Sequence, residues 1–217
     1  MISLEHIEII KNVVALTLAY LMIASIAGAF QAWIASKVGD STARSFGFMT
    51  LNPFMHVELM SLVIMPIGYL IFGVVIGLSR PVPIIWHHIT RSLKWLKFTL
   101  VACAQPLAIL IMLFGLLVLR LIFLVSLPTW SQAALLTIIS AVVSFAIWFI
   151  PYQLLMSLTQ IYIHEQEKRG VVSNQLLLLL VPLLGAVLLI DVSRIALLYM
   201  LGGMEWVLEL FVKSIIG

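Results

Sequence analysis

Residues 98–127 read FTLVACAQPLAILIMLFGLLVLRLIFLVSL, and Arg120 is the one charged side chain among them. A helix needs about 20 apolar residues to cross the hydrocarbon core of a bilayer, so this run is long enough to span a membrane. Four further apolar segments lie at roughly 7–36, 58–79, 131–161 and 174–200. The sequence therefore predicts an all-α, polytopic membrane helix bundle with about five spans.

The composition of the whole chain agrees with this class. Of its 217 residues, 63% are hydrophobic and 10% are charged, and the mean hydropathy is +1.20. These values exclude an ordinary soluble domain and a disordered chain. Unbroken apolar runs favour helices over the alternating strands of a membrane barrel. We expect a single integral membrane domain over 1–217, and no nucleic-acid partner because the net charge of +3 is small and scattered.

The segments between the spans predict smaller elements. Residues 84–97 place apolar side chains on one helical face and basic ones mostly on the other, which predicts an interfacial amphipathic helix anchored by Trp86. A short C-terminal helix is expected over 204–217, and a polar linker over 162–173. Pro66, Pro106, Pro151 and Pro182 lie inside apolar runs, and each is expected to kink its helix.

Charged residues inside the apolar runs are candidate functional groups, because charge in a membrane is costly. Asp191 and Arg194 lie three residues apart in the fifth segment, and Arg120 lies at a similar depth in the third. Two interpretations remain open. The three side chains form either a buried ion pair beside an arginine that reaches the interface, or a polar site shared between helices.

Residues 37–66, KVGDSTARSFGFMTLNPFMHVELMSLVIMP, carry a family resemblance. They resemble the site-2 protease family of intramembrane zinc metalloproteases, in which a helix with an HExxH motif leads into a Gly-Asp pair. The matching positions are Gly39-Asp40, Ala43-Arg44, Gly47, Thr50-Leu51-Asn52-Pro53 and His56-Val57-Glu58. Weaker matches follow at 80–83, at 101–108 and at 189–194, where Asp191 corresponds to the family's third zinc ligand. The resemblance implies a site-2-protease-like fold.

The metal-binding motif itself is missing from this sequence. Counting back from Gly39-Asp40 places it at 27–31, which reads AGAFQ and contains neither His nor Glu. A lone Asp191 cannot hold catalytic zinc, which takes three protein ligands. We therefore expect no catalytic residue, no metal and no cofactor, and a proteolytically inactive membrane protein.

The resulting hypothesis is a scaffold subunit that binds or assembles another integral membrane protein or transmembrane helix. The candidate vestigial or partner-binding residues are Ala27, Gly28, Gln31, Asn52, Pro53 and Asp191. Arg120 or Arg194 would supply the positive charge that zinc gave to Asp191. Two alternatives are an active metalloprotease with unusual ligands and a transporter or ion-conducting subunit. The expected location is a multi-pass position in a bacterial inner membrane.

The orientation in the membrane stays open at this point. With five alternating spans, one side carries Lys11, Arg80, Arg91, Lys94, Lys97, Lys168 and Arg169, and the other carries Lys37, Arg44 and Lys213. The positive-inside rule places the first side in the cytoplasm. The resemblance instead implies a cytoplasmic 37–57 linker.

Overall fold

A computed structural model gives the structure of the chain. It describes residues 4–72, 77–89, 93–126 and 129–168, together with single positions and short pieces at 180, 184–185, 195, 198–199, 201–203, 206 and 210. Within this part the chain is helical, and its only β-type pairing is an isolated bridge between Val57 and Ser79. The helices are α1 (Leu4–Val38), α2 (Thr42–Ser45), α3 (Pro53–His56), α4 (Leu59–Phe72), the 3-10 helix η1 (Trp86–His88), α5 (Lys94–Ala102), α6 (Ala104–Ser126) and α7 (Thr129–Lys168).

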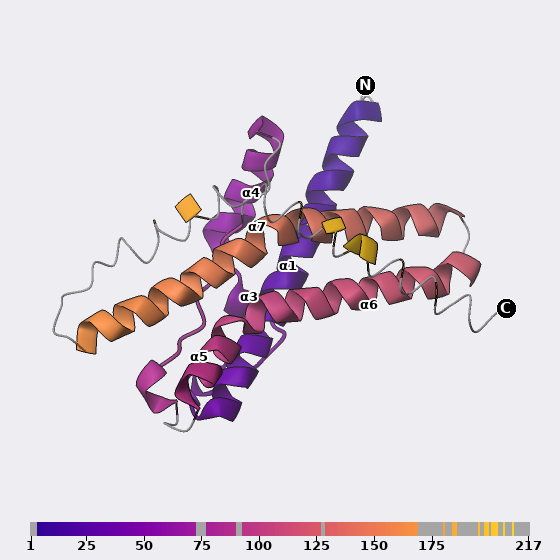
Figure 1. Cartoon of the computed structure of the whole chain (residues 1–217). Helices are drawn as coiled ribbons and strands as arrows, with labels where there is room; N and C mark the ends of the chain where they lie inside the picture. Colours follow the sequence, from indigo (N-terminus) through magenta and orange to yellow (C-terminus); the bar gives the residue numbers. More distant parts are fainter. Residues whose placement is uncertain are drawn as a thin grey trace.

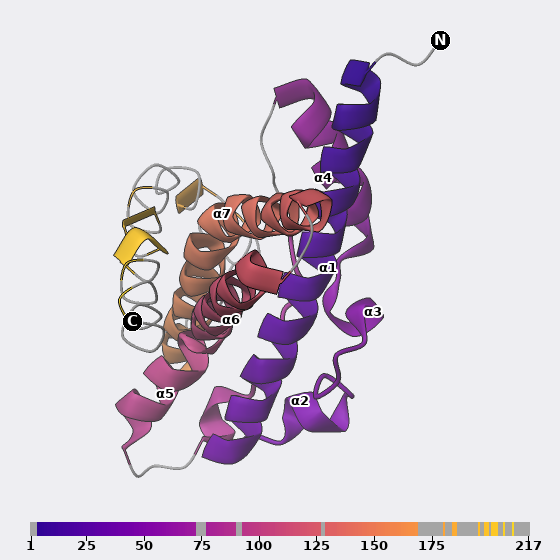
Figure 2. The same ribbon diagram turned by 90° about the vertical axis from the view of Figure 1, so that its right-hand side faces the viewer.

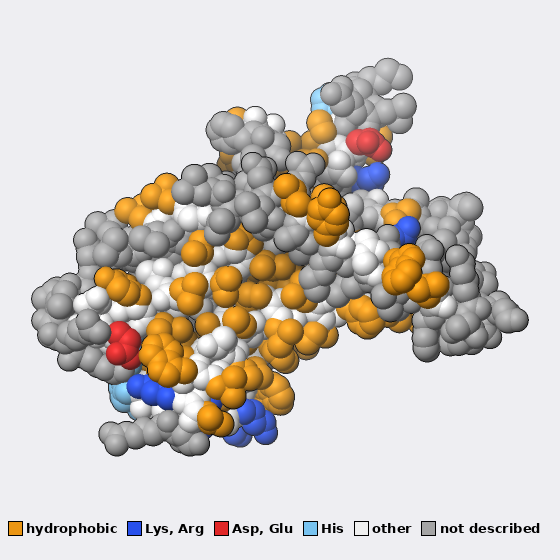
Figure 3. Space-filling view, in the orientation of Figure 1, with side chains coloured by type: hydrophobic (Ala, Val, Ile, Leu, Met, Phe, Trp, Pro, Cys, Tyr) orange, Lys and Arg blue, Asp and Glu red, His pale blue; other side chains and the backbone are white. Residues whose placement is uncertain are grey.

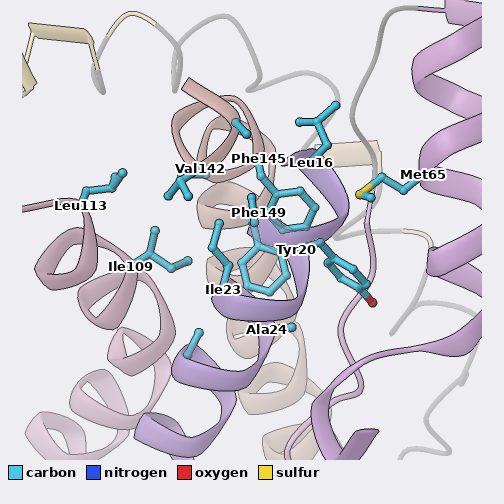
Figure 4. Packing of buried hydrophobic residues seen from close by; sticks show 14 of the residues in the cluster. Leu16, Tyr20, Ile23, Ala24, Met65, Ile109, Leu113, Val142, Phe145 and Phe149 are labelled. Atoms are coloured by element: carbon cyan, nitrogen blue, oxygen red, sulfur yellow. The ribbon is translucent and has the colours of Figure 1, made fainter. Parts of the chain in front are cut away.

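Three long helices form the centre of the molecule. Helix α1 stands upright in Figure 1, and the antiparallel pair α6 and α7 crosses it. The cluster between them contains Tyr20 and Ile23 from α1, Ile109 from α6, and Phe145 and Phe149 from α7 (Figure 4). The rings of Tyr20 and Phe145 lie 5.3 Å apart. Large side chains from three helices thus meet in one core, which fixes how α1 sits against the pair.

The prediction of a helical membrane protein is confirmed at this level. Two stretches, His6–Val38 and Leu135–Gln166, are long and apolar enough to cross a bilayer. A third is obtained if α5 and α6 are counted together, although they are bent by 51°. The bend at Cys103 lies three residues before Pro106, whose ring excludes the regular helical bond to the carbonyl of residue 102. The kink expected from Pro106 is therefore present.

The segment 58–79 differs from the prediction of a single crossing. Helix α4 has 14 residues, which is about 21 Å of helix and short of the roughly 30 Å apolar core. Both ends of the segment also lie together, since Val57 and Ser79 form a bridge and the Arg80 amide donates to the His56 carbonyl at 2.7 Å. The 37–57 and 80–97 linkers therefore lie at the same end of α1, not at opposite ends.

The predicted amphipathic helix over 84–97 is also wrong. The structure has η1 at its start, and α5 begins at Lys94 after Leu93, which has left-handed backbone angles. Trp86 and Ile89 are buried against Ala35 of α1 instead of facing a membrane. Tertiary packing thus overrides the helical period of the sequence. The polar linker over 162–173 is corrected in part, because α7 stays helical to Lys168.

The fifth predicted span and the C-terminal helix fall largely outside the described residues. Among the residues that are described there, Gly185 lies against α7, because a Cβ on Gly185 would come 2.7 Å from a methyl carbon of Leu155. Leu201 packs on the central cluster. These two positions therefore belong to the same packed body as α1 and α7.

Candidate functional site

The position expected for the metal motif is filled by a histidine from another element. His56, the last residue of α3, is fully buried and lies against Gly28 of α1. Its Nε2 is 2.7 Å from the Thr50 carbonyl, so Nε2 carries the proton and donates. Its Nδ1 then faces α1, where a Cβ on Gly28 would approach it to 2.3 Å. The absent side chain of Gly28 is what admits the imidazole.

The surroundings of His56 keep its ring neutral. Burial lowers the pKa of His56, the bond to the Thr50 carbonyl raises it, and the nearby charge of Arg80 lowers it further, with a net decrease. Among the described residues, Nδ1 has no hydrogen-bond partner. A neutral ring that presents a lone pair to a glycine is compatible with tight helix packing, whereas a charged ring would leave an unsatisfied donor there.

Gln31 lies one turn further along α1 than Gly28 and contacts α5 and α6 instead of α3. Its Oε1 accepts from Nε2 of Gln105 at 2.5 Å, and its Nε2 donates to the Val101 carbonyl at 3.1 Å. Both glutamine side chains are buried. Val101 lies at the end of α5 and Gln105 at the start of α6, so Gln31 supports the bend between these two helices. The vestigial site is thus divided between two separate contacts of α1.

A double-mutant cycle tests this glutamine pair. Replacing Gln31 by Leu is expected to destabilise the protein by about 1–3 kcal/mol, because it leaves Gln105 and the Val101 carbonyl buried without their partner. Adding Gln105→Leu should recover part of that loss, since apolar replacement of both partners can be nearly neutral. Unfolding of the detergent-solubilised variants by SDS or heat measures the stability of the single and the double variant. Strictly additive losses would contradict the coupling.

The remaining predicted site residues are dispersed. Ala27 is buried beside Gly28 in the helix interface. Asn52 is exposed and caps α3 by accepting the Phe54 amide at 3.1 Å, and Pro53 is half-buried at the first position of that helix. Arg120 is half-buried on α6. Asp191 and Arg194 lie outside the described residues.

Asp40 stabilises the fold. It was not among the charged residues singled out inside the predicted spans. Its side chain is fully buried and accepts four donors. The amide and hydroxyl of Thr42 donate at 3.0 and 2.5 Å, the Ile85 amide donates at 2.8 Å, and His88 Nδ1 lies 3.4 Å away. The carboxylate therefore joins the two linkers. The signal in the sequence was the Gly39-Asp40 pair itself.

A polar groove lies between α1, α4 and α7. It encloses about 230 Å³. Its polar side chains are Asn12, Tyr69, Thr137, Ser140 and Ser144. The Asn12 amide donates to the Tyr69 hydroxyl at 3.3 Å. Ser140 and Ser144 are exposed and donate to carbonyls of their own helix, so their oxygens keep the capacity to accept.

Metal-ligand geometry gives no further candidate within the described ranges. No group of three or more His, Cys, Asp or Glu residues is arranged there to hold a metal ion. Comparisons with known proteins add no identity. The chain matches no protein-family model, no curated protein and no solved structure.

Proposed function

We propose that this chain is a multi-pass membrane protein that acts as a non-catalytic scaffold and binds a transmembrane helix of a partner membrane protein. The observation that carries the proposal is the groove between α1, α4 and α7. Polar groups at membrane depth are uncommon and serve as contacts between helices. A groove that offers serine oxygens on an exposed helix face suits a partner helix with Ser, Thr, Asn or Gln side chains.

The packing around 27–31 supports the non-catalytic part of the proposal. A hydrolytic zinc site keeps an open coordination position for water and substrate. Here Gly28 is covered by His56, and Gln31 is bonded to Gln105. These side chains contribute to stability, and opening them to a substrate would break buried polar contacts.

The same proposal includes an orientation with the C-terminal end of α1 in the cytoplasm. Because the two linkers lie together, the basic residues are redistributed relative to five alternating spans. Four described basic residues lie on elements near this end: Lys37 on α1, Arg44 on α2, and Lys94 and Lys97 on α5. Lys11 lies near the opposite end of α1. The positive-inside rule and the family resemblance then agree.

Site-specific crosslinking in the native membrane tests the scaffold. A photo-reactive amino acid at Ser140 should give a discrete adduct with one membrane protein, and Asn12→Leu should reduce that adduct at least several-fold by altering the groove. The matched control is the same probe at Ile111, which is 56% exposed on α6 and lies away from the groove. Equal adducts from both positions, or none from Ser140, would contradict the proposal.

Quantifying zinc in the detergent-purified protein tests the non-catalytic part of the proposal. The scaffold predicts far less than one zinc per chain. Stoichiometric zinc that is lost on chelation would overturn the non-catalytic assignment and would favour a metalloprotease with unusual ligands.

A further inference from the structure

Large apolar side chains are exposed on elements that lie outside the long helices. In the segment after α1, Phe46 is 65% exposed, Leu51 67% and Phe54 72%. These residues belong to the short α2–α3 region, which contains polar turns and is too irregular to span a bilayer. In an aqueous loop this much exposed aromatic and aliphatic surface would be costly. The region therefore requires an apolar environment on its outer side.

A second group of such side chains lies on the other flank of α1. On α5, Trp95 is 73% exposed and Leu96 is 60% exposed. Figure 2 shows α2 and α3 on one side of the lower part of α1 and α5 on the other. Trp33, which is 43% exposed, lies on α1 itself near the same end. We name these six residues the collar, because they surround one end of α1.

Cations accompany the collar. The Lys37 ammonium lies 5.8 Å from the centre of the Trp33 ring, and the Lys94 ammonium lies 5.1 Å from that of Phe98. Figure 3 shows Lys and Arg side chains beside hydrophobic ones at this lower end. Among the described residues, no carboxylate lies within 4 Å of Lys37 or Arg44. Asp40, the acidic residue between them in sequence, is buried and bonded to the Ile85 amide, so it forms no ion pair with either cation at the surface.

We propose that the collar and the cations beside it form a binding surface for anionic phospholipids of the leaflet at this end of α1. Aromatic side chains favour the interface between headgroups and acyl chains, and lysine and arginine beside them attract anionic lipid. The apolar side chains on both flanks of α1 then lie in the leaflet, and the cations lie at headgroup level. The collar shares no residue with the groove, so this inference is independent of the proposed scaffold function.

Thermal unfolding in a neutral detergent tests the anion preference. Short-chain phosphatidylglycerol should stabilise the full chain more than short-chain phosphatidylcholine or inorganic phosphate. In Lys37→Gln/Arg44→Gln, the apparent affinity for phosphatidylglycerol should fall about fivefold for each charge removed. Lys11→Gln, an exposed lysine at the other end of α1, is the matched control and should bind like the parent. An equal response to inorganic phosphate, or equal affinity in both variants, would overturn the lipid assignment.

Depth measurements in vesicles test the apolar part. In a Cys103→Ser background, a fluorophore on a cysteine at position 54 or 95 should be quenched by spin-labelled lipid and shielded from aqueous iodide. The same label at position 8, exposed near the start of α1, is the control for an aqueous site. Quenching by iodide at 54 and 95 would place the collar in water. Shielding from both quenchers would assign the surface to a protein contact, and either result would overturn the proposal.

Discussion

Replacing Gly28 by Ala is expected to lower the free energy of unfolding by about 2–3 kcal/mol, the upper part of the range for overpacked cores. The new methyl group would lie 2.3 Å from Nδ1 of His56. The imidazole cannot move away freely, because its Nε2 is bonded to the Thr50 carbonyl and the ring packs edge-on against Phe48. Unfolding by heat or SDS in detergent gives the difference in free energy of unfolding between the variant and the parent protein.

Gly115→Ala is the matched control for this substitution. Gly115 is also inside a long apolar helix, and nothing lies within 4 Å of the Cβ it would gain. Its replacement should leave stability unchanged or raise it by up to about 1 kcal/mol through helix propensity. The double variant Gly28→Ala/His56→Ala should recover at least half of the loss. If Gly28→Ala behaved like Gly115→Ala, the close approach of α1 and His56 would be wrong.

Replacing Asp40 by Ala is expected to cost about 2–4 kcal/mol, since hydrogen bonds to a charged group are among the stronger ones and the half-buried Thr42 and Ile85 amides would lose their acceptor. The loss should concentrate at the junction of the linkers, where the Ile85 amide now donates to the carboxylate. Limited proteolysis should therefore show faster cleavage between α1 and α5 than in the parent protein. Unchanged stability and cleavage would show that the carboxylate does not hold the linkers together.

The same carboxylate gives a prediction for pH. Burial alone raises the pKa of Asp40, but the bonds from Thr42, Ile85 and His88 outweigh it and bring the pKa below 3.8. A carboxyl whose pKa is lower in the folded state stabilises the fold above its unfolded pKa, and this stabilisation is lost as the pH falls through the folded pKa. Stability of the parent should thus decline below about pH 4. In Asp40→Asn this part of the decline should be absent.

Hydropathy predicted the long helices well and the connections between them poorly. The runs that became α1 and α7 exceed the thickness of a bilayer, and length alone is enough to predict them. For 58–79 the same count predicted a crossing. It could not show that the chain turns back, because the contacts that close the segment join Val57 to Ser79 and Tyr20 of α1 to Leu78. Such contacts depend on tertiary structure and leave no periodic signal.

The sequence named residues of the candidate site but not the residues that they contact. It singled out 27–31, and in the structure Gly28 and Gln31 of this stretch both make close contacts with other elements. It did not reveal their partners, because His56 and Gln105 lie in other elements and the pairings have no fixed spacing.

The closed neck of the 57–80 segment also bears on how the protein is made. Tyr20 accepts the Glu58 amide at 3.1 Å and donates to the Leu78 carbonyl at 2.6 Å, so one phenol on the first helix holds the entry and the exit of the segment. This arrangement closes the segment as a hairpin whose two ends meet beside the middle of α1. It also allows the first helix to act as the template on which that hairpin closes.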